Sequence, residues 1–540
     1  MFLDFATEWE AVADSAPERD AIVQGDRRIT YREFDDKAAR FASALDAAGV
    51  EEEAKVALYL FNSPEYLIAQ HGAFKHRAVP INVNYRYLDN ELVYLLENSD
   101  AQALVFHTSL GACVDRVRDQ LINVRLFVEV DDGGAHVDGA TEFEDLLARH
   151  EPQARKERSP DDLYMLYTGG TTGMPKGVMY PQGDLTERIV TAVAVTRGIQ
   201  TVPRERGDLA SFVAAVNEPD VLTSIPCCPL MHGTGMWVSA MPALLSGGTV
   251  LLLEGRSFDA HEVWRLVERE RAAVVVIVGD PFARPLLRAL EEREAAGRPY
   301  DTSSVRFIHS SGAIWSSEIK DGLRSRLTAI LVDSLGSTEG GTIGLSGATR
   351  DLGAETAHFT LAPDSKVVNE DRREVSRWTG EQGMLATRTA AYAYFKDPDK
   401  TAQTFIKLDG ESYVLTGDWA TVDEDGSINL LGRGSMSINS GGEKIFAEEV
   451  EEAVKRHPQV DDCLVVGIPD ERFGQRVVAV IGTKATPPTP EEVVEFLRGS
   501  LAPYKIPKAV IVRDAVQRAP NGKADYKWAR EVALEEHVER

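Results

Sequence analysis

The strongest chemical signal in the sequence is a run of glycines and threonines that ends in a lysine. It reads Thr168-Gly169-Gly170-Thr171-Thr172-Gly173-Met174-Pro175-Lys176. Glycines permit backbone conformations that turn several N–H groups toward one anion, and a lysine adds a mobile positive charge. Pro175 precedes the lysine and Gly177 follows it, so the Gly-Lys-Ser/Thr loop of common nucleoside triphosphatases is excluded. The run predicts a phosphate-binding loop of another kind, and the alternative is a flexible surface loop.

Further groups of small and charged residues occur later in the chain. They are Ser310-Ser311-Gly312-Ala313, Asp333-Ser334-Leu335-Gly336-Ser337-Thr338-Glu339, Thr416-Gly417-Asp418, Leu431-Gly432-Arg433 and Pro520-Asn521-Gly522-Lys523. Each has an ordinary explanation when taken alone, because Asp418 could be a turn residue and Arg433 or Lys523 a solvated cation. The functional interpretation depends on their order along the chain.

In that order, the groups resemble the motifs of the adenylate-forming superfamily, which comprises acyl-CoA synthetases, adenylation domains and firefly-type luciferases. The resemblance spans residues 165–525. Within that superfamily, the sequence most resembles actinobacterial fatty-acyl- and steroid-side-chain-CoA synthetases. Leu335 stands where the family usually has an aromatic residue against adenine. Stacking on adenine is therefore expected to be weaker, or to come from another residue.

This resemblance implies a two-step reaction that needs ATP, Mg²⁺ and CoA. A carboxylate attacks the α-phosphorus of ATP and expels pyrophosphate, which leaves an acyl-adenylate, and a thiol then displaces AMP. The first step brings an anion against a polyanion, so catalysis must depend on positioning and on neutralisation of charge. The expected partners are a small carboxylic acid, ATP and CoA.

The resemblance also implies a role for each matching residue. The implied catalytic residues are Lys523, Glu339, Thr338 and Lys176, with Glu339 as the ligand of Mg²⁺. The implied ATP-binding residues are Thr168, Gly169, Gly170, Thr171, Thr172, Gly173, Lys176, Ser311, Gly312, Ala313, Asp333, Ser334, Gly336, Thr338, Asp418, Arg433 and Lys523. His232 and Gly233 are expected at the carboxylate end of the acyl site. Gly441, Gly442 and Lys444 are expected to contact CoA after the C-terminal domain rotates.

Two other functions remain open on the sequence alone. The first is a stand-alone adenylation enzyme that loads the thiol of a carrier protein, and Asp280 after a buried run keeps an amino-acid-selecting site possible. The second is a non-catalytic nucleotide-binding regulator. The presence of Lys176, Glu339 and Lys523 argues against the regulator, because these residues are most useful when charge develops during a reaction.

The elements expected to position these residues alternate between strands and helices. Strands are predicted at 55–61, 78–83, 272–278, 305–309 and 329–333, and helices at 65–75, 89–98 and 281–292. This alternation favours an α/β fold with parallel-rich sheets flanked by helices, in which ligands bind beyond the carboxyl ends of strands. The polar segment 197–221 is interpreted as a surface insertion.

The pattern of predicted strands and helices changes near 432–437. A helix at 447–457, strands at 460–467, 477–482 and 509–512, and a helix at 490–498 predict a compact α+β unit. We therefore expect a large domain over residues 1–432, which binds ATP and the acyl group. A small mobile domain over residues 433–540 is expected to carry the catalytic lysine.

Composition and net charge limit the partners and the cellular compartment that we expect for the chain. The 540 residues include 59 Lys+Arg and 85 Asp+Glu, which gives a net charge of −26 and disfavours nucleic acids and anionic membranes as partners. The four cysteines lack a metal-binding spacing and favour a reducing compartment over a disulfide framework. Without a signal-like start or a long apolar run, the chain is expected to be cytoplasmic with no membrane span, and a homodimer is possible.

Overall fold

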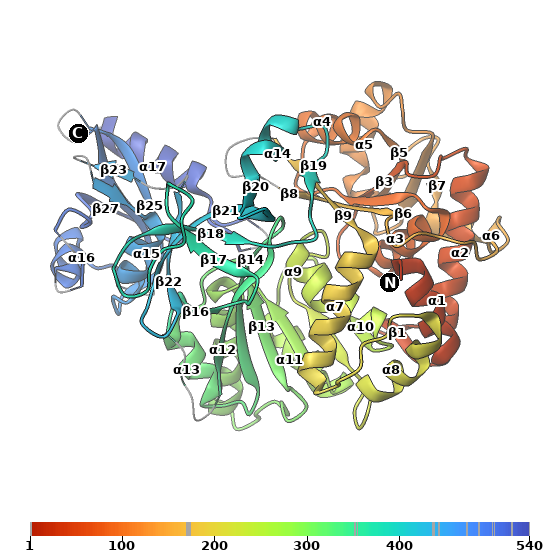
Figure 1. The fold of residues 1–540 in the computed structure, drawn as a ribbon, viewed down its shortest axis with the longest axis horizontal. Helices are drawn as coiled ribbons and strands as arrows, with labels where there is room; N and C mark the ends of the chain where they lie inside the picture. The colour runs from red at the N-terminus through yellow and green to blue at the C-terminus, as the bar shows by residue number, and fades with distance from the viewer. Residues whose placement is uncertain are drawn as a thin grey trace.

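The fold is that of a computed structural model, which describes residues 3–168, 174–349, 353, 355–434, 438–440, 443–470, 474–483, 486–498, 500–501, 503–519 and 522–538. It confirms the predicted fold class. Parallel-rich sheets flanked by helices form the larger part, and a small α+β unit near the C-terminus lies at one end of the molecule (Figure 1).

The largest sheet combines a parallel half and an antiparallel half. Its order is β17-β18-β21-β22-β16-β15-β14-β13-β12-β10-β11-β1-β2, with β20 paired to β21. The strands are β1 (Asp20–Gln24), β2 (Arg27–Thr30), β10 (Thr223–Pro226), β11 (Thr249–Leu252), β12 (Val274–Ile277), β13 (Phe307–Ser311), β14 (Ile330–Ser337), β15 (Gly341–Ala348), β16 (His358–Leu361), β17 (Ser365–Val368), β18 (Gly383–Thr387), β20 (Phe405–Leu408), β21 (Glu411–Val422) and β22 (Ser427–Arg433). Strands β1, β11, β10, β12, β13 and β14 are parallel neighbours. Their carboxyl ends therefore meet along one edge, where loops can assemble a site.

Two smaller sheets belong to the same large part of the molecule. A parallel sheet has the order β4 (Val79–Asn82), β3 (Lys55–Tyr59), β5 (Ala101–His107), β6 (Leu126–Val130) and β7 (Thr141–Glu142). An antiparallel sheet joins β19 (Ala393–Tyr394), β9 (Lys176–Pro181) and β8 (Leu163–Thr168). The predicted phosphate loop connects β8 to β9; its residues 169–173 lie outside the described part of the chain, and this small sheet fixes the two ends of the loop, Thr168 and Lys176.

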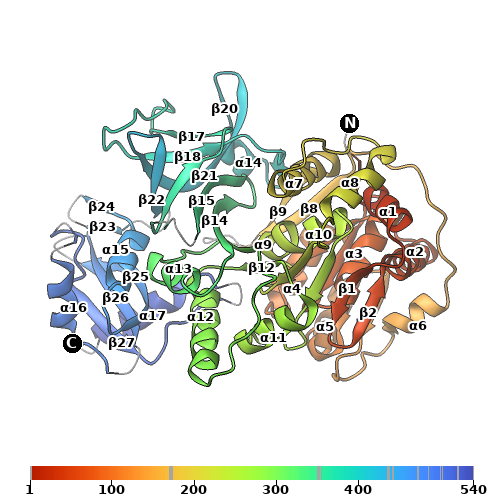
Figure 2. The ribbon, with the colours of Figure 1, turned by 90° about the horizontal axis from the view of Figure 1, so that it is seen from below.

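The helices cover the sheets on both faces. They are α1 (Phe5–Ser15), α2 (Tyr31–Ala47), α3 (Pro64–His76), α4 (Asp89–Ser99), α5 (Gly111–Val117), α6 (Phe143–Ala148), α7 (Gln182–Arg197), α8 (Leu209–Val216), α9 (Gly233–Gly235), α10 (Met241–Leu245), α11 (Ala260–Glu270), α12 (Asp280–Ala295), α13 (Ser317–Arg324) and α14 (Pro398–Thr404). Local signals set several of their starts: Thr30 and Glu33 form a capping box at α2, and Ser63 caps α3 ahead of Pro64. Helices α11, α12 and α13 pack on one side of the parallel strands, and α7 lies on the other (Figure 2).

The C-terminal unit has a sheet of its own. Its strands are β23 (Ile438–Ser440), β24 (Glu443–Ile445), β25 (Val460–Asp470), β26 (Gly474–Thr483) and β27 (Ala509–Arg513), and its helices are α15 (Ala447–Lys455), α16 (Pro490–Leu497) and α17 (Tyr526–Val538). Buried side chains such as Val465, Val477 and Val493 form a separate core between this sheet and α15 and α16. The domain boundary at 432/433 remains a prediction.

The strands and helices predicted around the motifs occur within a few residues of the expected positions, but the interpretation of 197–221 as a plain surface insertion is wrong in part. This segment contains α8, whose apolar side chains Leu209, Phe212, Val213 and Val216 are buried, and α8 packs against α1. The spacing i, i+3, i+4, i+7 is that of an amphipathic helix. The polar residues on either side of α8 concealed this pattern.

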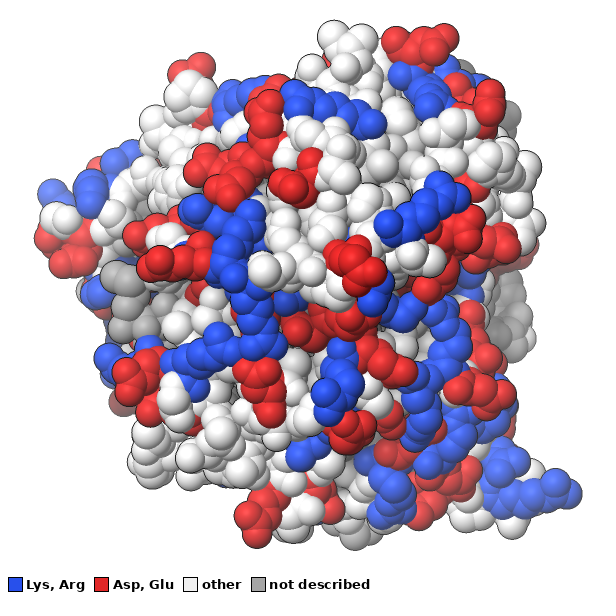
Figure 3. Space-filling model, turned by 90° about the vertical axis from the view of Figure 1, so that its right-hand side faces the viewer, with Lys and Arg blue, Asp and Glu red and all other residues white. Residues whose placement is uncertain are grey.

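Charged side chains of both signs are interspersed over the face formed by the N-terminal elements (Figure 3). Ion pairs such as Lys37–Glu144 at 2.6 Å and Arg155–Asp14 at 2.8 Å account for part of this mixture. All four cysteines are buried free thiols. Among the described residues, none of the helices combines the length and apolarity that a bilayer crossing requires.

Replacement of Phe212 tests the packing of α8. Its side chain is 4% exposed within the core of the N-terminal part. Phe212→Ala should lower the free energy of unfolding by ~3 kcal/mol, because it removes buried apolar contacts and leaves a cavity. Urea titration followed by tryptophan fluorescence measures the change, and Ser211→Ala on the exposed side of α8 is the control. Equal midpoints for the two variants would contradict the packing.

Candidate active site

One large cavity lies at the carboxyl ends of the parallel strands and is covered on one side by the C-terminal unit. Its volume is about 2840 Å³. Among its lining residues are most of those expected to bind substrates: Thr168, Lys176, His232, Gly233, Ser311, Gly312, Ala313, Asp333, Ser334, Gly336, Thr338, Glu339, Asp418, Arg433 and Lys523. Residues 169–173, 441 and 442 lie outside the described part of the chain, and Lys444 is described only as a residue of β24.

On the predicted phosphate side of the cavity, Lys176 and Glu339 are each bound by a neighbouring side chain. Thr168 and Lys176, the two ends of the predicted phosphate loop, pair across β8 and β9. Lys176 forms an ion pair with Asp397, and Glu339 accepts a hydrogen bond of 2.8 Å from the hydroxyl of Tyr394. Lys176 is therefore neutralised within the protein, and a triphosphate would have to replace Asp397 as its partner.

A buried asparagine joins the phosphate loop to the acyl side of the cavity. The Asn82 side-chain amide donates to the carbonyl oxygens of Tyr167 at 2.8 Å and Met231 at 2.7 Å, and its oxygen accepts from the Tyr167 N–H at 2.7 Å. Tyr167 directly precedes Thr168, and Met231 directly precedes His232. Asn82 at the end of β4 thus sets the distance between two predicted binding segments.

On the opposite side of the cavity, a carboxylate and a guanidinium group pair across two neighbouring strands. Asp418 on β21 faces Arg433 on β22, and the Arg433 Nε lies 3.2 Å from an Asp418 carboxylate oxygen. The charge of Asp418 raises the pKa of Arg433 above its usual range, so the guanidinium stays charged. The buried Asp418 carboxylate keeps oxygen atoms on the cavity surface that can accept hydrogen bonds from ribose hydroxyls.

Position 432, where the end of β22 meets the C-terminal unit, requires a glycine. Gly432 has φ +114°, and a Cβ there would overlap the carboxylate of Glu448 on α15. The same carboxylate accepts a hydrogen bond of 2.8 Å from the Arg433 N–H, and burial raises the pKa of Glu448 to about 7. The start of α15 is thereby held against the end of β22.

Lys523 belongs to the C-terminal unit and reaches the cavity that the larger part forms. Its amine faces the cavity, but the surrounding protein and the nearby charge of Arg433 lower its pKa, while Glu339 and Asp418 oppose that shift. Lys523 also contributes to the low pKa of His232. These mutual influences show that Lys523 lies among the predicted nucleotide and acyl residues.

The loop that carries Lys523 is held from both sides. Gly522 has φ +74°, and a Cβ there would come within 3.4 Å of Phe282, Val278 and Pro281 of the larger part. Within the C-terminal unit, Arg518 donates to the Gly522 carbonyl at 3.1 Å and pairs with Asp462 at 2.5 Å.

A second contact between the two parts is an ion pair. Arg288 on α12 lies 2.8 Å from Asp461 on β25, and Arg284 lies 3.7 Å from the same carboxylate. Asp280, which kept an amino-acid-selecting site open, is engaged otherwise, because its buried carboxylate accepts from the Ser316 N–H at 2.9 Å and lies 3.5 Å from Arg284.

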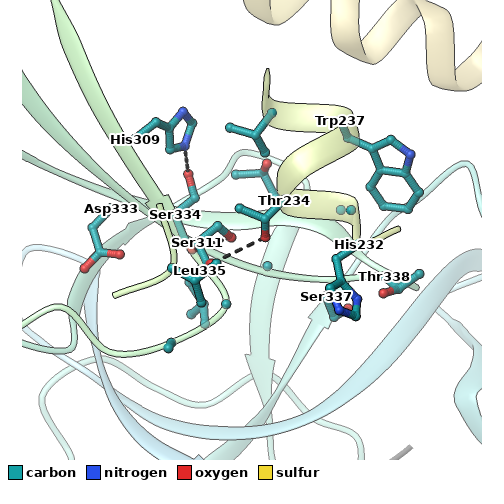
Figure 4. Close-up of a pocket in the computed structure, with 18 of the residues that line it drawn as sticks. His232, Thr234, Trp237, His309, Ser311, Asp333, Ser334, Leu335, Ser337 and Thr338 are labelled. Atoms are coloured by element: carbon teal, nitrogen blue, oxygen red, sulfur yellow. Dashed lines mark hydrogen bonds between the residues drawn. The ribbon is translucent and has the colours of Figure 1, made fainter. Parts of the chain in front are cut away.

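The predicted acyl and adenine ends of the cavity are lined by residues of α9, β13 and β14. His232 occupies the N-cap position of α9 without a side-chain capping hydrogen bond, and burial lowers the pKa of His232 to about 3, so the imidazole is neutral at physiological pH. His309 contacts the Ser334 hydroxyl, and Thr234 donates to the Ser311 carbonyl at 3.4 Å (Figure 4).

Asp333 is directed differently from its neighbours on β14. Its side chain points away from the group around Ser311 (Figure 4) and pairs with the buried Lys320 of α13 at 2.9 Å. Burial raises the pKa of Asp333 to about 6, and Lys320 counteracts the shift. The predicted contact of Asp333 with ATP must therefore coexist with this internal ion pair.

Sequence reasoning missed Asn82, Tyr394 and Asp397. Asn82 lies within a short apolar strand, and its role appears only when three separate chain segments meet. The tyrosine and the aspartate stand in Tyr394-Phe395-Lys396-Asp397-Pro398, where Asp-Pro before a helix was the one available signal. Nothing in the sequence spacing connects Tyr394 to Glu339, which lies 55 residues away.

Removal of the Lys523 amine should separate the two half-reactions. Lys523→Ala is expected to slow adenylation by ~10²–10³-fold, because one charge partner of the transition state is lost. Thioester formation from supplied acyl-adenylate should keep its rate. Stopped-flow or quenched assays of each half-reaction measure both effects. An equal loss in both would contradict the placement of Lys523 at the adenylation step alone.

Asn82 offers a test of positioning. Asn82→Ala should raise the KM for ATP and reduce kcat/KM by about tenfold or more, since it leaves buried backbone groups of Tyr167 and Met231 without partners. Asn82→Asp, which keeps an acceptor for the Tyr167 N–H, is the matched comparison. Unchanged ATP kinetics in a stably folded Asn82→Ala protein would remove Asn82 from the site.

Comparison with known proteins identifies family matches and relatives that span almost the whole chain. Residues 9–393 match the AMP-binding enzyme family, and residues 449–523 match the AMP-binding enzyme C-terminal domain. A 3-oxocholest-4-en-26-oate–CoA ligase of Rhodococcus rhodochrous is 40% identical over 98% of this chain and 96% of the relative. A medium/long-chain-fatty-acid–CoA/3-oxocholest-4-en-26-oate–CoA ligase of Mycolicibacterium smegmatis is 39% identical over 99% of this chain and 97% of the relative.

Solved structures share the fold at lower identity. An anthranilate CoA ligase crystallised with anthranoyl-AMP has a TM-score of 0.84 at 20% identity over 99% of this chain and 98% of its own. ATP-bound MatB from Rhodopseudomonas palustris has a TM-score of 0.80 at 23% identity over 98% of this chain and 99% of its own. The family matches, the full-length relatives and the shared fold agree with the ordered motifs, and we conclude that the chain belongs to the AMP-binding enzyme family.

Proposed function

We propose that this chain, an acyl-CoA synthetase, activates a carboxylic acid with a long apolar body, such as a fatty acid or the side-chain acid of a steroid. The observation that carries the proposal is the convergence of Lys176, Glu339, Arg433 and Lys523 on one cavity. The two relatives above are named for acids of this kind, and they match this chain along almost its whole length.

In this proposal each charged residue meets a defined part of the substrates. Lys176 exchanges Asp397 for the β- and γ-phosphates, and Asp418 accepts from the ribose hydroxyls. Lys523 lies between the acid and the α-phosphate and stabilises the negative charge that develops as the carboxylate attacks phosphorus. Neutral His232 lines the carboxylate end without adding a charge to it.

The residues present fit a magnesium ion held mainly by its substrate. Mg²⁺ is typically bound by one or two carboxylates together with phosphate oxygens and water. The described residues contain no group of three or more His, Cys, Asp or Glu that would hold a metal alone, and Glu339 offers one carboxylate on the cavity surface. When bound, Mg²⁺ would neutralise phosphate charge as pyrophosphate leaves.

CoA is the proposed thiol acceptor, with Gly441, Gly442 and Lys444 as its proposed contacts. The engagement of Asp280 by Ser316 and Arg284 disfavours a site that selects amino acids for a carrier protein. The cytoplasmic location and the possible homodimer stay predictions.

Pyrophosphate exchange tests the proposal directly. The purified chain should exchange labelled pyrophosphate into ATP only when a suitable acid is present, and CoA should then be consumed with release of AMP. A panel of fatty, aromatic and steroid side-chain acids serves as the substrate set, and the Lys523→Ala protein is the control for background exchange.

Two results would contradict the proposal in different ways. No exchange with any acid would favour the nucleotide-binding regulator. Exchange without consumption of CoA, followed by transfer to a carrier-protein thiol, would favour the stand-alone adenylation enzyme.

A further inference from the structure

The cavity continues beyond the adenylation residues as a groove between α7 and one face of the parallel sheet. From the sheet, Val274, Phe307, His309, Ile330 and Val332 line this groove, and from the helix Leu185, Ile189, Ala192 and Thr196 line it at helical spacing. The other face of the same strands is covered by α11, α12 and α13. The groove is therefore formed by the sheet and α7, and it does not lie between the two parts of the molecule.

The two ends of the groove are identified by contacts of α7 and its neighbours. Tyr180, just before α7, donates to the Thr338 carbonyl and so ties the start of the helix to the adenylation site. Arg197, the last residue of α7, lies near Arg306, which directly precedes β13. Helix α7 thus runs antiparallel to β13, with its carboxyl end at the far end of the groove.

The length of the groove follows from its walls. Phe307 and Ser311 lie on the same side of β13, and four residues of strand span about 13 Å. Along the other wall, the helix from Leu185 to Arg197 spans about 18 Å. An acid about 18 Å long that lies along α7, with its carboxylate beside Leu185, would bring its opposite end to Arg197.

The far end of the groove is charged, although its walls are largely apolar. Arg197, Glu218, Asp220 and Arg306 all line it, and Arg306 pairs with Asp220 at 2.9 Å. Arg197 is half-buried, and among the described residues its guanidinium makes no hydrogen bond and no ion pair within 4 Å, although the charges of Arg306 and Asp220 both act on it. A guanidinium carries five N–H donors, so Arg197 presents donors to whatever occupies this end.

We propose that the far end of the groove is a subsite for a neutral oxygen, a keto or hydroxyl group, that the acid carries at the end opposite its carboxylate, and that Arg197 donates the hydrogen bond. The proposal rests on the proposed function and specifies its substrate class. Two arginines and two acidic residues balance at this end, so a second carboxylate gains no net attraction. This end is open to solvent, because the Arg306 and Asp220 side chains are 61% and 62% exposed, so a purely apolar end would displace water from the Arg197 donors without replacing its hydrogen bonds.

A structural role for Arg197 is the competing explanation. A cation in the last turn of a helix interacts favourably with the helix dipole, and Arg197 ends α7 just before Gly198. This role predicts that a substitution lowers stability and affects every acid alike. The proposed subsite predicts that the loss depends on the far-end oxygen of the substrate.

The test compares two acids that differ only at the far end. One is a steroid side-chain acid with a ring oxo group, and the other is the same acid without that group. In pyrophosphate exchange, Arg197→Met should reduce kcat/KM for the oxo acid by about tenfold or more, the usual effect of one hydrogen bond to a charged group. Its kcat/KM for the deoxy acid should stay within about twofold. Arg197→Lys should retain part of the preference.

Controls and opposing outcomes separate the explanations. Arg265→Met, on α11 across the sheet and paired with Asp259, should change neither acid. Equal loss for both acids in Arg197→Met, or equal use of both by the unaltered chain, would overturn the subsite. Preference for a diacid of matched length would also overturn it, because the bound oxygen would then be a carboxylate. Absence of exchange with either acid, while a short aromatic acid is activated, would show that the proposed acid class itself is wrong.

Discussion

The cavity depends on a balance of charge, because it must bring a carboxylate to a triphosphate inside a chain whose net charge is −26. Two of the cations at this site pair with carboxylates. Lys176 pairs with Asp397, and Arg433 pairs with Asp418 across two strands. Pairing offsets part of the desolvation cost of each partly buried charge, and loss of either partner would leave the other charge uncompensated. Substrate binding then becomes an exchange of partners at fixed positions.

The two parts of the molecule differ in net charge. Residues 433–540 contain 16 Lys+Arg and 18 Asp+Glu and are nearly neutral, so most of the negative charge belongs to residues 1–432. Lys523 comes from the nearly neutral unit and is placed against the acidic part by Gly522 and by the Arg288–Asp461 pair. These contacts describe an arrangement suited to adenylation. A rotation that releases Lys523 would also have to break them.

The sequence predicted the motifs and their surroundings well, because those features are local. Buried runs such as Val274–Ile277 and capped helices such as α2 depend on nearby residues, and the order of the Gly-rich and charged groups indicated the site. Residues whose role is created by distant contacts could not be predicted. Asn82 acts through Tyr167 and Met231, Glu339 meets Tyr394, and the groove exists only because α7 lies beside the sheet.

We predict that the contacts between the two parts hold Lys523 in place for adenylation and must open before the thiol reacts. Arg288→Cys and Asp461→Cys, joined by a short thiol-reactive linker, would hold the two sides of that contact together. The account predicts that the linked protein retains pyrophosphate exchange with its acid but loses CoA thioester formation, which cleavage of the linker restores. Thioester formation at an unchanged rate in the linked protein would contradict it.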